Sequence, residues 1–75
     1  MIKLKSVHRD WIIDMTPETL SDGFSARAWV QREAREGETQ GENFIFCDLG
    51  HYATQREAAA RGESWAIRWL NENDY

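Results

Sequence analysis

Cys47 and His51 are the residues whose types could do nucleophilic chemistry, because a thiolate close to an imidazole base is the usual pairing for it. Such a pair works only within hydrogen-bond reach and with a third group that orients the base. The sequence places Cys47 inside a strand and His51 in a turn. A cysteine in the middle of a strand is typically buried and unreactive. The pair therefore predicts no catalysis, and the chain is predicted not to be an enzyme.

The other polar residues give no second candidate for an active or metal site. The tripeptide His8-Arg9-Asp10 occurs in kinase catalytic loops, but a chain of 75 residues cannot hold a kinase and no glycine-rich loop precedes it. One cysteine and two histidines fall short of the four ligands of a structural zinc site. No two acids have a spacing that favours acid–base work. We expect no metal, no cofactor and no small-molecule substrate.

The length and the cysteine content of the chain indicate how its fold is stabilised. The 75 residues predict a single domain over 1–75, with a small core and a stability of a few kcal/mol. The only cysteine, Cys47, cannot form an internal disulfide. Self-association is the remaining way to supplement the small core, so a homodimer is predicted.

Charge and the first residues bear on partners and compartment. Thirteen acids against nine bases argue against non-specific binding to nucleic acid. Residues 1–7 lack the apolar run of a signal peptide or a membrane span, so a cytoplasmic protein without membrane contact is expected.

Period-two alternation predicts three strands, at residues 11–15, 24–32 and 44–49. The apolar phase differs between Leu4, on an even position, and Trp11, on an odd one, which predicts a break at 6–9. Pro17 makes 16–23 a connection, and the glutamates and glycines of 33–43 predict a solvated hairpin loop.

The helix has the clearest local signals in the chain. Thr54 and Glu57 form a capping box, so the helix is predicted to begin directly after Thr54. Gly62 lies on the apolar face, where it predicts close approach of the helix backbone to the sheet. The predicted buried face consists of Ala58, Ala59, Gly62, Trp65, Ala66, Trp69 and Leu70. The fold class is therefore α+β: a three-stranded antiparallel sheet (β-β-β-α) with one C-terminal helix packed on one face.

One helix covers only one face of such a sheet, yet both faces carry apolar residues. If Asp10, Asp14 and Asp48 point outward, large apolar side chains of all three strands share their face. Such an exposed patch is typical of a binding surface. If strand three has the opposite register, Ile45 and Cys47 face outward instead. The predicted partner-binding residues are Ile12, Arg27, Trp29, Gln31, Phe44 and Phe46.

Three interpretations of this patch stay open: a homodimer packed sheet on sheet, a protein partner, and single-stranded nucleic acid stacked on Phe44, Phe46 and Trp29. The negative charge disfavours nucleic acid. Size and charge also permit an inhibitor of a host defence complex encoded by a phage or plasmid. The function predicted is a small, non-catalytic protein-interaction module.

Two resemblances add to this interpretation. Residues 8–72 resemble small uncharacterised proteobacterial proteins of three strands and a helix, a likeness that implies the fold alone. It is carried by His8-Arg9-Asp10-Trp11-x-Ile13, Pro17, Asp22-Gly23-Phe24-x-Ala26, Tyr52-Ala53-Thr54-x-x-Glu57-Ala58, Gly62 and Trp69-Leu70. The segment Asp48-Leu49-Gly50-x-Tyr52-Ala53-Thr54-x-x-Glu57-Ala58 is similar to the N-terminal domain of HicB-type antitoxins. That similarity implies a domain that neutralises a toxin.

Overall fold

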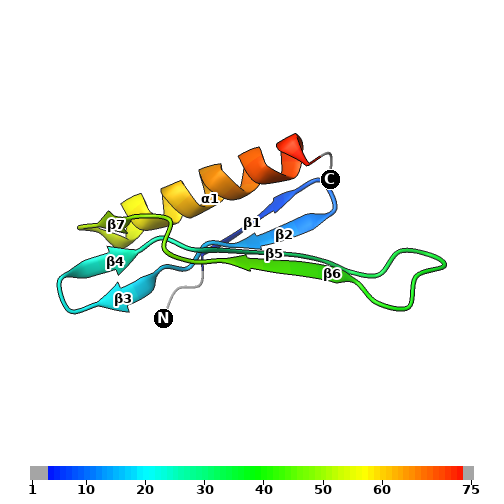
Figure 1. The fold of residues 1–75 in the computed structure, drawn as a ribbon, viewed down its shortest axis with the longest axis horizontal. Helices are drawn as coiled ribbons and strands as arrows, with labels where there is room; N and C mark the ends of the chain where they lie inside the picture. Colours follow the sequence, from blue (N-terminus) through cyan, green and yellow to red (C-terminus); the bar gives the residue numbers. More distant parts are fainter. Residues whose placement is uncertain (1–3, 74–75) are drawn as a thin grey trace.

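The computed structural model describes residues 4–73, which form antiparallel sheets covered on one side by a C-terminal helix (Figure 1). The α+β class and the single terminal helix are as expected from the sequence. The sheet is larger than expected: the described residues form seven strands in two sheets. The elements are β1 (Lys5–His8), β2 (Trp11–Asp14), β3 (Glu18–Leu20), β4 (Gly23–Ser25), β5 (Ala28–Arg32), β6 (Glu42–Phe46), β7 (His51–Tyr52) and α1 (Gln55–Glu72). The strand order is β1-β2-β5-β6 in one sheet and β3-β4-β7 in the other.

The predicted break before Trp11 is present but lies at Arg9 and Asp10, because residues 5–14 form a tight hairpin. β1 pairs with β2 in antiparallel register, with His8 opposite Trp11 and Lys5 opposite Asp14. Only Arg9 and Asp10 lie between the strands, and Arg9 has a φ of 58°. A two-residue turn places even positions opposite odd ones, so the change of phase marks a turn and not a bulge.

The predicted second strand is divided at residues 26–27. β4 pairs with β3 and β7, while β5 pairs with β2 and β6. Between the two parts, Ala26 is hydrogen-bonded to the segment that connects β6 to β7. The Leu49 N–H donates to the Ala26 carbonyl oxygen at 2.9 Å, and the Ala26 N–H donates to the Gly50 carbonyl oxygen at 2.8 Å. Two segments predicted as connections contain short strands, β3 and β7. Together with β4 they form the second sheet, which lies at the end of the molecule where the helix begins (Figure 1).

The helix begins as predicted. Thr54 is the N-cap, and its hydroxyl oxygen accepts from the Glu57 backbone N–H at 3.2 Å. The hydroxyl also donates to Glu57 Oε1 at 3.0 Å, so the carboxylate meets the side chain of Thr54. The buried helical residues are Ala58, Ala59, Gly62, Ala66 and Leu70. Among residues 4–73, no helix combines the length and apolar character that crossing a membrane requires.

Gly62 confirms the predicted close approach of helix and sheet. A Cβ at this position would collide with the Arg27 carbonyl oxygen and lie 3.4 Å from the Met15 Cβ. Because the obstacle is a backbone oxygen, a rotamer change cannot remove it. Gly62 therefore lets α1 lie directly on the start of β5, over the buried core of Trp11, Ile13 and Val30.

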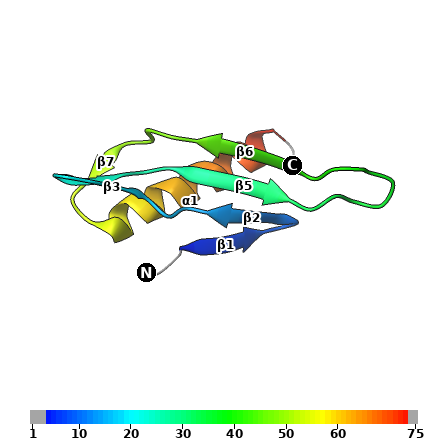
Figure 2. The same cartoon turned by 90° about the horizontal axis from the view of Figure 1, so that it is seen from below.

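Aromatic side chains extend this core toward β6. Phe46 packs on Trp65 and Trp69, with ring centroids 4.4 and 5.0 Å apart, and Phe44 lies 5.0 Å from Trp69. α1 itself lies over β2, β4, β5 and β7. The molecule is thin, with extents of 46 × 26 × 16 Å, and Figure 2 shows the four-stranded sheet from its uncovered side. One face of that sheet therefore has no covering layer among the described residues.

Candidate functional site: the open face of the four-stranded sheet

The side of the sheet β1-β2-β5-β6 opposite α1 is the candidate site and is called the open face below. Strand register defines it, because residues directly opposite each other in an antiparallel sheet point to the same side. Lys5, Asp14, Trp29 and Ile45 form one row, and Val7, Ile12, Gln31 and Asn43 form the next. With the adjoining Arg27 and Cys47, the open face consists of Lys5, Val7, Ile12, Asp14, Arg27, Trp29, Gln31, Asn43, Ile45 and Cys47.

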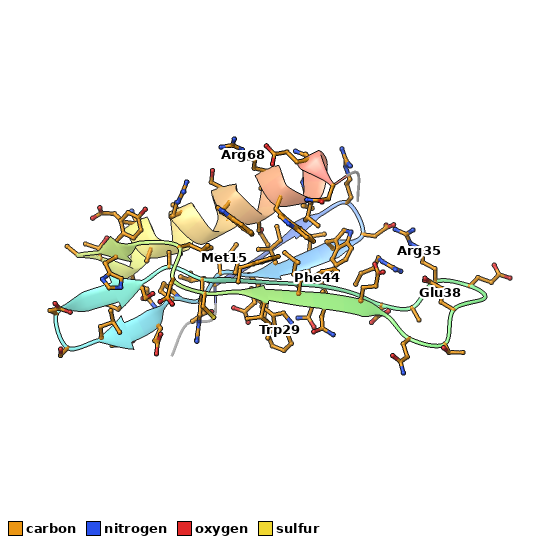
Figure 3. All side chains as sticks on the ribbon, viewed as in Figure 1. Met15, Trp29, Arg35, Glu38, Phe44 and Arg68 are labelled. Carbon is orange, nitrogen blue, oxygen red and sulfur yellow. The ribbon has the colours of Figure 1, made fainter. Side chains whose placement is uncertain are left out.

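Four large apolar side chains cross the open face, one from each strand. Val7 is 73% exposed, Ile12 38%, Trp29 40% and Ile45 60%. Val7 lies opposite Ile12, and Trp29 lies opposite Ile45 one row away, so the four form a diagonal band, called the apolar stripe below. Figure 3 shows Trp29 pointing away from the helix, whereas Met15 and Phe44 lie between helix and sheet. Contiguous apolar exposure of this kind marks interaction surfaces.

Four of the six predicted binding residues lie on the open face: Ile12, Arg27, Trp29 and Gln31. The prediction that Phe44 and Phe46 face outward is wrong, because both pack against the core under α1. The prediction assumed that Asp48 belongs to the same strand as Phe44 and Phe46 and therefore shares their face. Asp48 has a φ of 57°, and β6 ends at Phe46, so the alternation of faces does not continue to position 48.

Ile45 and Cys47 therefore face outward, which is the opposite register for strand three that the sequence left open. Val7 was missed altogether. Its signal was the change of apolar phase before Trp11, which becomes informative once Arg9 and Asp10 are recognised as a two-residue turn. The dipeptide Arg9-Asp10 is not one of the Asn-Gly or Asp-Gly pairs that mark such turns, so the hairpin has no direct signal in the sequence.

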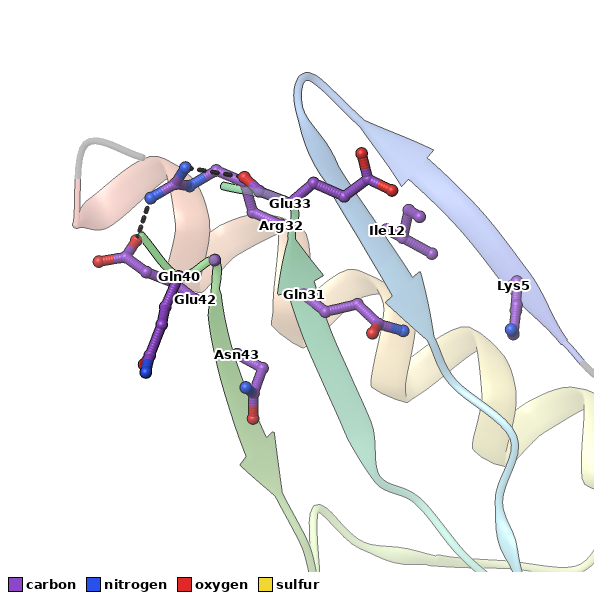
Figure 4. Close-up of a pocket in the computed structure, with 9 residues that line it drawn as sticks. Lys5, Ile12, Gln31, Arg32, Glu33, Gln40, Glu42 and Asn43 are labelled. Carbon is purple, nitrogen blue, oxygen red and sulfur yellow. Dashed lines mark hydrogen bonds and ion pairs between the residues drawn. The ribbon is translucent and has the colours of Figure 1, made fainter. Parts of the chain in front are cut away.

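Two hollows flank the apolar stripe. One, of about 410 Å³, is lined by Trp29 and Ile45 together with Asp14, Thr16, Arg27, Ala28 and Cys47. The other, of about 500 Å³, is shown in Figure 4 and is lined by Ile12 and Gln31 together with Lys5, Arg32, Glu33, Gln40, Gly41, Glu42 and Asn43. The hollows carry charges of both signs beside apolar side chains. This mixture suits the surface of another protein better than a phosphate backbone.

Arg32 fixes the end of the sheet next to the second hollow. Its side chain is 5% exposed and makes ion pairs with Glu38 at 2.9 Å and Glu42 at 3.0 Å (Figure 4 shows the Glu42 pair). Its guanidinium also lies 5.7 Å from the centre of the Trp11 ring. A loop connects β5 to β6 as expected, but it spans 33–41 and not 33–43, because β6 begins at Glu42. The Arg32–Glu38 pair holds this loop against the sheet.

The hydrogen bond from Arg32 is the main reason that the pKa of Glu38 falls from its ordinary value of 4.5 to about 2. The Arg35 backbone N–H adds a second hydrogen bond, at 2.7 Å. Accepting two donors stabilises the ionised carboxylate. The pKa of Arg32 is raised, chiefly by its hydrogen bonds to Glu38 and Glu42, so this residue stays charged.

Acid is therefore expected to weaken the fold through Glu38. Because the pKa is lower in the folded chain, the contribution of Glu38 is complete above about pH 4.5 and decreases as the pH falls toward 2. Urea unfolding of wild type and Glu38→Gln at a series of pH values checks this. The stability difference between them should shrink steadily below about pH 4.5. A difference that does not depend on pH would contradict this assignment.

The residues first considered for catalysis do not meet. Cys47 follows β6 and is exposed on the open face, which corrects the prediction of a buried thiol within a strand. His51 lies in β7, in the other sheet. Within residues 4–73, no group of three or more His, Cys, Asp or Glu side chains is placed to hold a metal ion.

Comparisons of the chain with protein-family models, curated proteins and solved structures find no match. The open face must therefore be interpreted from its own residues.

Proposed function

We propose that this chain is a non-catalytic interaction module that binds another protein through its open face. The observation that supports this function best is the apolar stripe, with four large side chains between 38% and 73% exposed on one uncovered side of a thin sheet. A partner that covers these side chains would gain roughly 25 cal/mol of binding free energy for each Å² of apolar surface removed from water. The charged neighbours Lys5, Asp14 and Arg27 would orient the partner rather than supply most of the affinity.

The shape of the open face favours a different protein over a second copy placed face to face. The hollows on either side of the stripe need convex side chains to fill them. A second open face would present the same stripe and the same hollows, so stripe would meet stripe unless the two faces were offset. Trp29 lies in β5, one of the two inner strands, and lines one hollow, so we propose it as the anchor of the interface.

Nucleic acid is not proposed as the partner. The stacking surface that it requires was expected to contain Phe44 and Phe46, and both lie on the helix side of the sheet, in contact with Trp69 of α1. Trp29 is the one aromatic residue of the open face, where Asp14 lies opposite it in the register. The resemblance to HicB-type antitoxins stays a prediction that the same partner experiments would address.

Photo-crosslinking tests the proposal. A photoreactive phenylalanine analogue is placed at Trp29 and, as a matched control, at Ala60, which is exposed on the outer side of α1. In the cells that produce the protein, position 29 should give a discrete adduct with a different protein, and position 60 should not.

The variant Trp29→Asp should reduce affinity for that partner at least tenfold, since truncating an aromatic anchor typically costs about 2 kcal/mol or more. Circular dichroism should show an unchanged fold, because Trp29 points into solvent. An adduct at position 29 that contains two copies of this chain, or no adduct there, would overturn the proposal.

A further inference from the structure

The strand β6 has a free backbone edge. The sheet order places β1 and β6 at the two edges within residues 4–73. Hydrogen bonding alternates along each antiparallel pair. The Met15 N–H donates to the Leu4 carbonyl at 2.9 Å, which fixes this alternation and allows it to be followed across β2 and β5. This alternation directs the N–H and C=O groups of Asn43 and Ile45 away from β5, toward the outer edge of the sheet.

The two edges differ in how they are protected. An exposed edge commonly carries lysine, proline or a bulge, each of which discourages pairing with another strand. β1 carries the exposed Lys5. β6 contains none of these features, and its only charged residue, Glu42, directs its carboxylate to Arg32 at 3.0 Å. The remaining residues of β6 include three strong strand formers, Phe44, Ile45 and Phe46.

Apolar side chains lie on both sides of this edge. Ile45 is 60% exposed on the open face. On the other side, Phe44, Phe46, Trp65 and Trp69 are only partly buried, because α1 lies over the neighbouring strands. A hollow of about 310 Å³ adjoins the two tryptophans and is lined by Arg61, Ser64, Trp65, Arg68, Trp69 and Glu72. A strand added at β6 would cover Ile45 and this aromatic row together.

We infer that a second copy of this chain pairs there, β6 against β6, in antiparallel register about a two-fold axis near Ile45. Ile45 then exchanges both backbone hydrogen bonds with Ile45 of the partner subunit. Phe44 lies across from Phe46 of the partner subunit, so the two aromatic rows join under the pair of helices. A two-fold axis suits this edge because the same outward groups are satisfied on both chains at once. The two sheets become one sheet of eight strands.

This inference does not rest on the proposed function, but it has a consequence for it. In the eight-stranded sheet, the two apolar stripes lie on the same side and meet at their Ile45 ends. The dimer would offer a partner protein a continuous surface with two Trp29 anchors. It would also supply the homodimer that the small core favours, through the strand edge and not through the open face.

A pair of lysine variants tests the dimer. Ile45→Lys and Val7→Lys place the same charge on the same face at opposite edges, and the two native side chains are similarly exposed. Sedimentation equilibrium across the micromolar range should give a dimer for wild type and for Val7→Lys. Ile45→Lys should raise the dimer Kd at least about tenfold, because lysine at an edge opposes pairing. Asn43→Pro, which removes an outward N–H, should act in the same direction.

Trp29→Asp separates this inference from the proposed function, since it alters the stripe and leaves the outward backbone groups of β6 unchanged. It should leave the dimer Kd unchanged. Amide hydrogen exchange gives a direct readout, because the amides of Asn43 and Ile45 should become more protected as protein concentration rises, and that of Val7 should not. A wild-type monomer throughout the range, or a dimer lost in Trp29→Asp or Val7→Lys and kept in Ile45→Lys, would overturn the inference.

Discussion

Replacing Gly62 by leucine is expected to unfold the protein or to leave it with little stability. The new Cβ would collide with the Arg27 carbonyl oxygen, and the rest of the side chain would have to enter the contact with Met15. Overpacking a core typically costs about 1–3 kcal/mol even when side chains can adjust. Here the helix must lift from β5, and a domain of this size has a margin of only a few kcal/mol.

Alanine at the same position makes the test sharper. Helix propensity alone predicts that Gly62→Ala stabilises by about 1 kcal/mol. The collision with Arg27 predicts the opposite sign. Urea unfolding of Gly62→Ala and Gly62→Leu should therefore show two destabilised proteins, with leucine the worse. Ala60→Leu, on the exposed side of the same helix, is the control and should be nearly neutral. A stabilised Gly62→Ala would refute the close approach.

The neighbouring variants Phe46→Asp and Ile45→Asp should behave in opposite ways. Phe46 packs on Trp65 and Trp69 under the helix, so aspartate there loses this contact and places a charge among aromatic rings. Truncation of a fully buried phenylalanine costs about 3–5 kcal/mol. Phe46 is partly buried, so its truncation should cost less, but a charge among the rings adds to that loss. Ile45 is 60% exposed, so Ile45→Asp should change monomer stability by less than about 1 kcal/mol.

Circular dichroism with urea unfolding, at one low protein concentration for both variants, measures the contrast. Phe46→Asp should lose the helical signal in the absence of urea, and Ile45→Asp should retain it. Phe44→Asp extends the test, because it removes the contact with Trp69 and should resemble Phe46→Asp. If Ile45→Asp unfolds the chain and Phe46→Asp does not, the register of β6 is the reverse of the one described here.

Together these variants separate the functions of the two sides of the sheet. Phe46 and Gly62 belong to the helix-covered side, where substitutions act on folding. Trp29 belongs to the open face, where substitutions should act on partner binding alone. Ile45 lies both at the sheet edge and on the open face, so its substitution can affect dimer formation and partner binding. The Val7 and Trp29 variants distinguish these two effects.

The sequence by itself determined the helix in detail. The pair Thr54 and Glu57 placed its start, and Gly62 at the centre of a stripe of small residues placed its contact with the sheet. These signals are local, because capping and helical periodicity act between residues three or four apart. The sequence also placed Ile12, Trp29 and Gln31 on the side of their strands that faces away from the core. Each of them alternates along its strand with apolar residues that are buried.

The tertiary structure decided the rest. Whether Phe44 and Phe46 or Ile45 and Cys47 face outward depends on where extended backbone ends. A left-handed residue, Asp48, interrupts the alternation after β6, and Arg9 turns an apparent break into a hairpin. The edges and the burial of Arg32 depend on which strands are neighbours in space. Pairing between residues far apart along the chain fixes these features, and alternation within one strand carries no information about it.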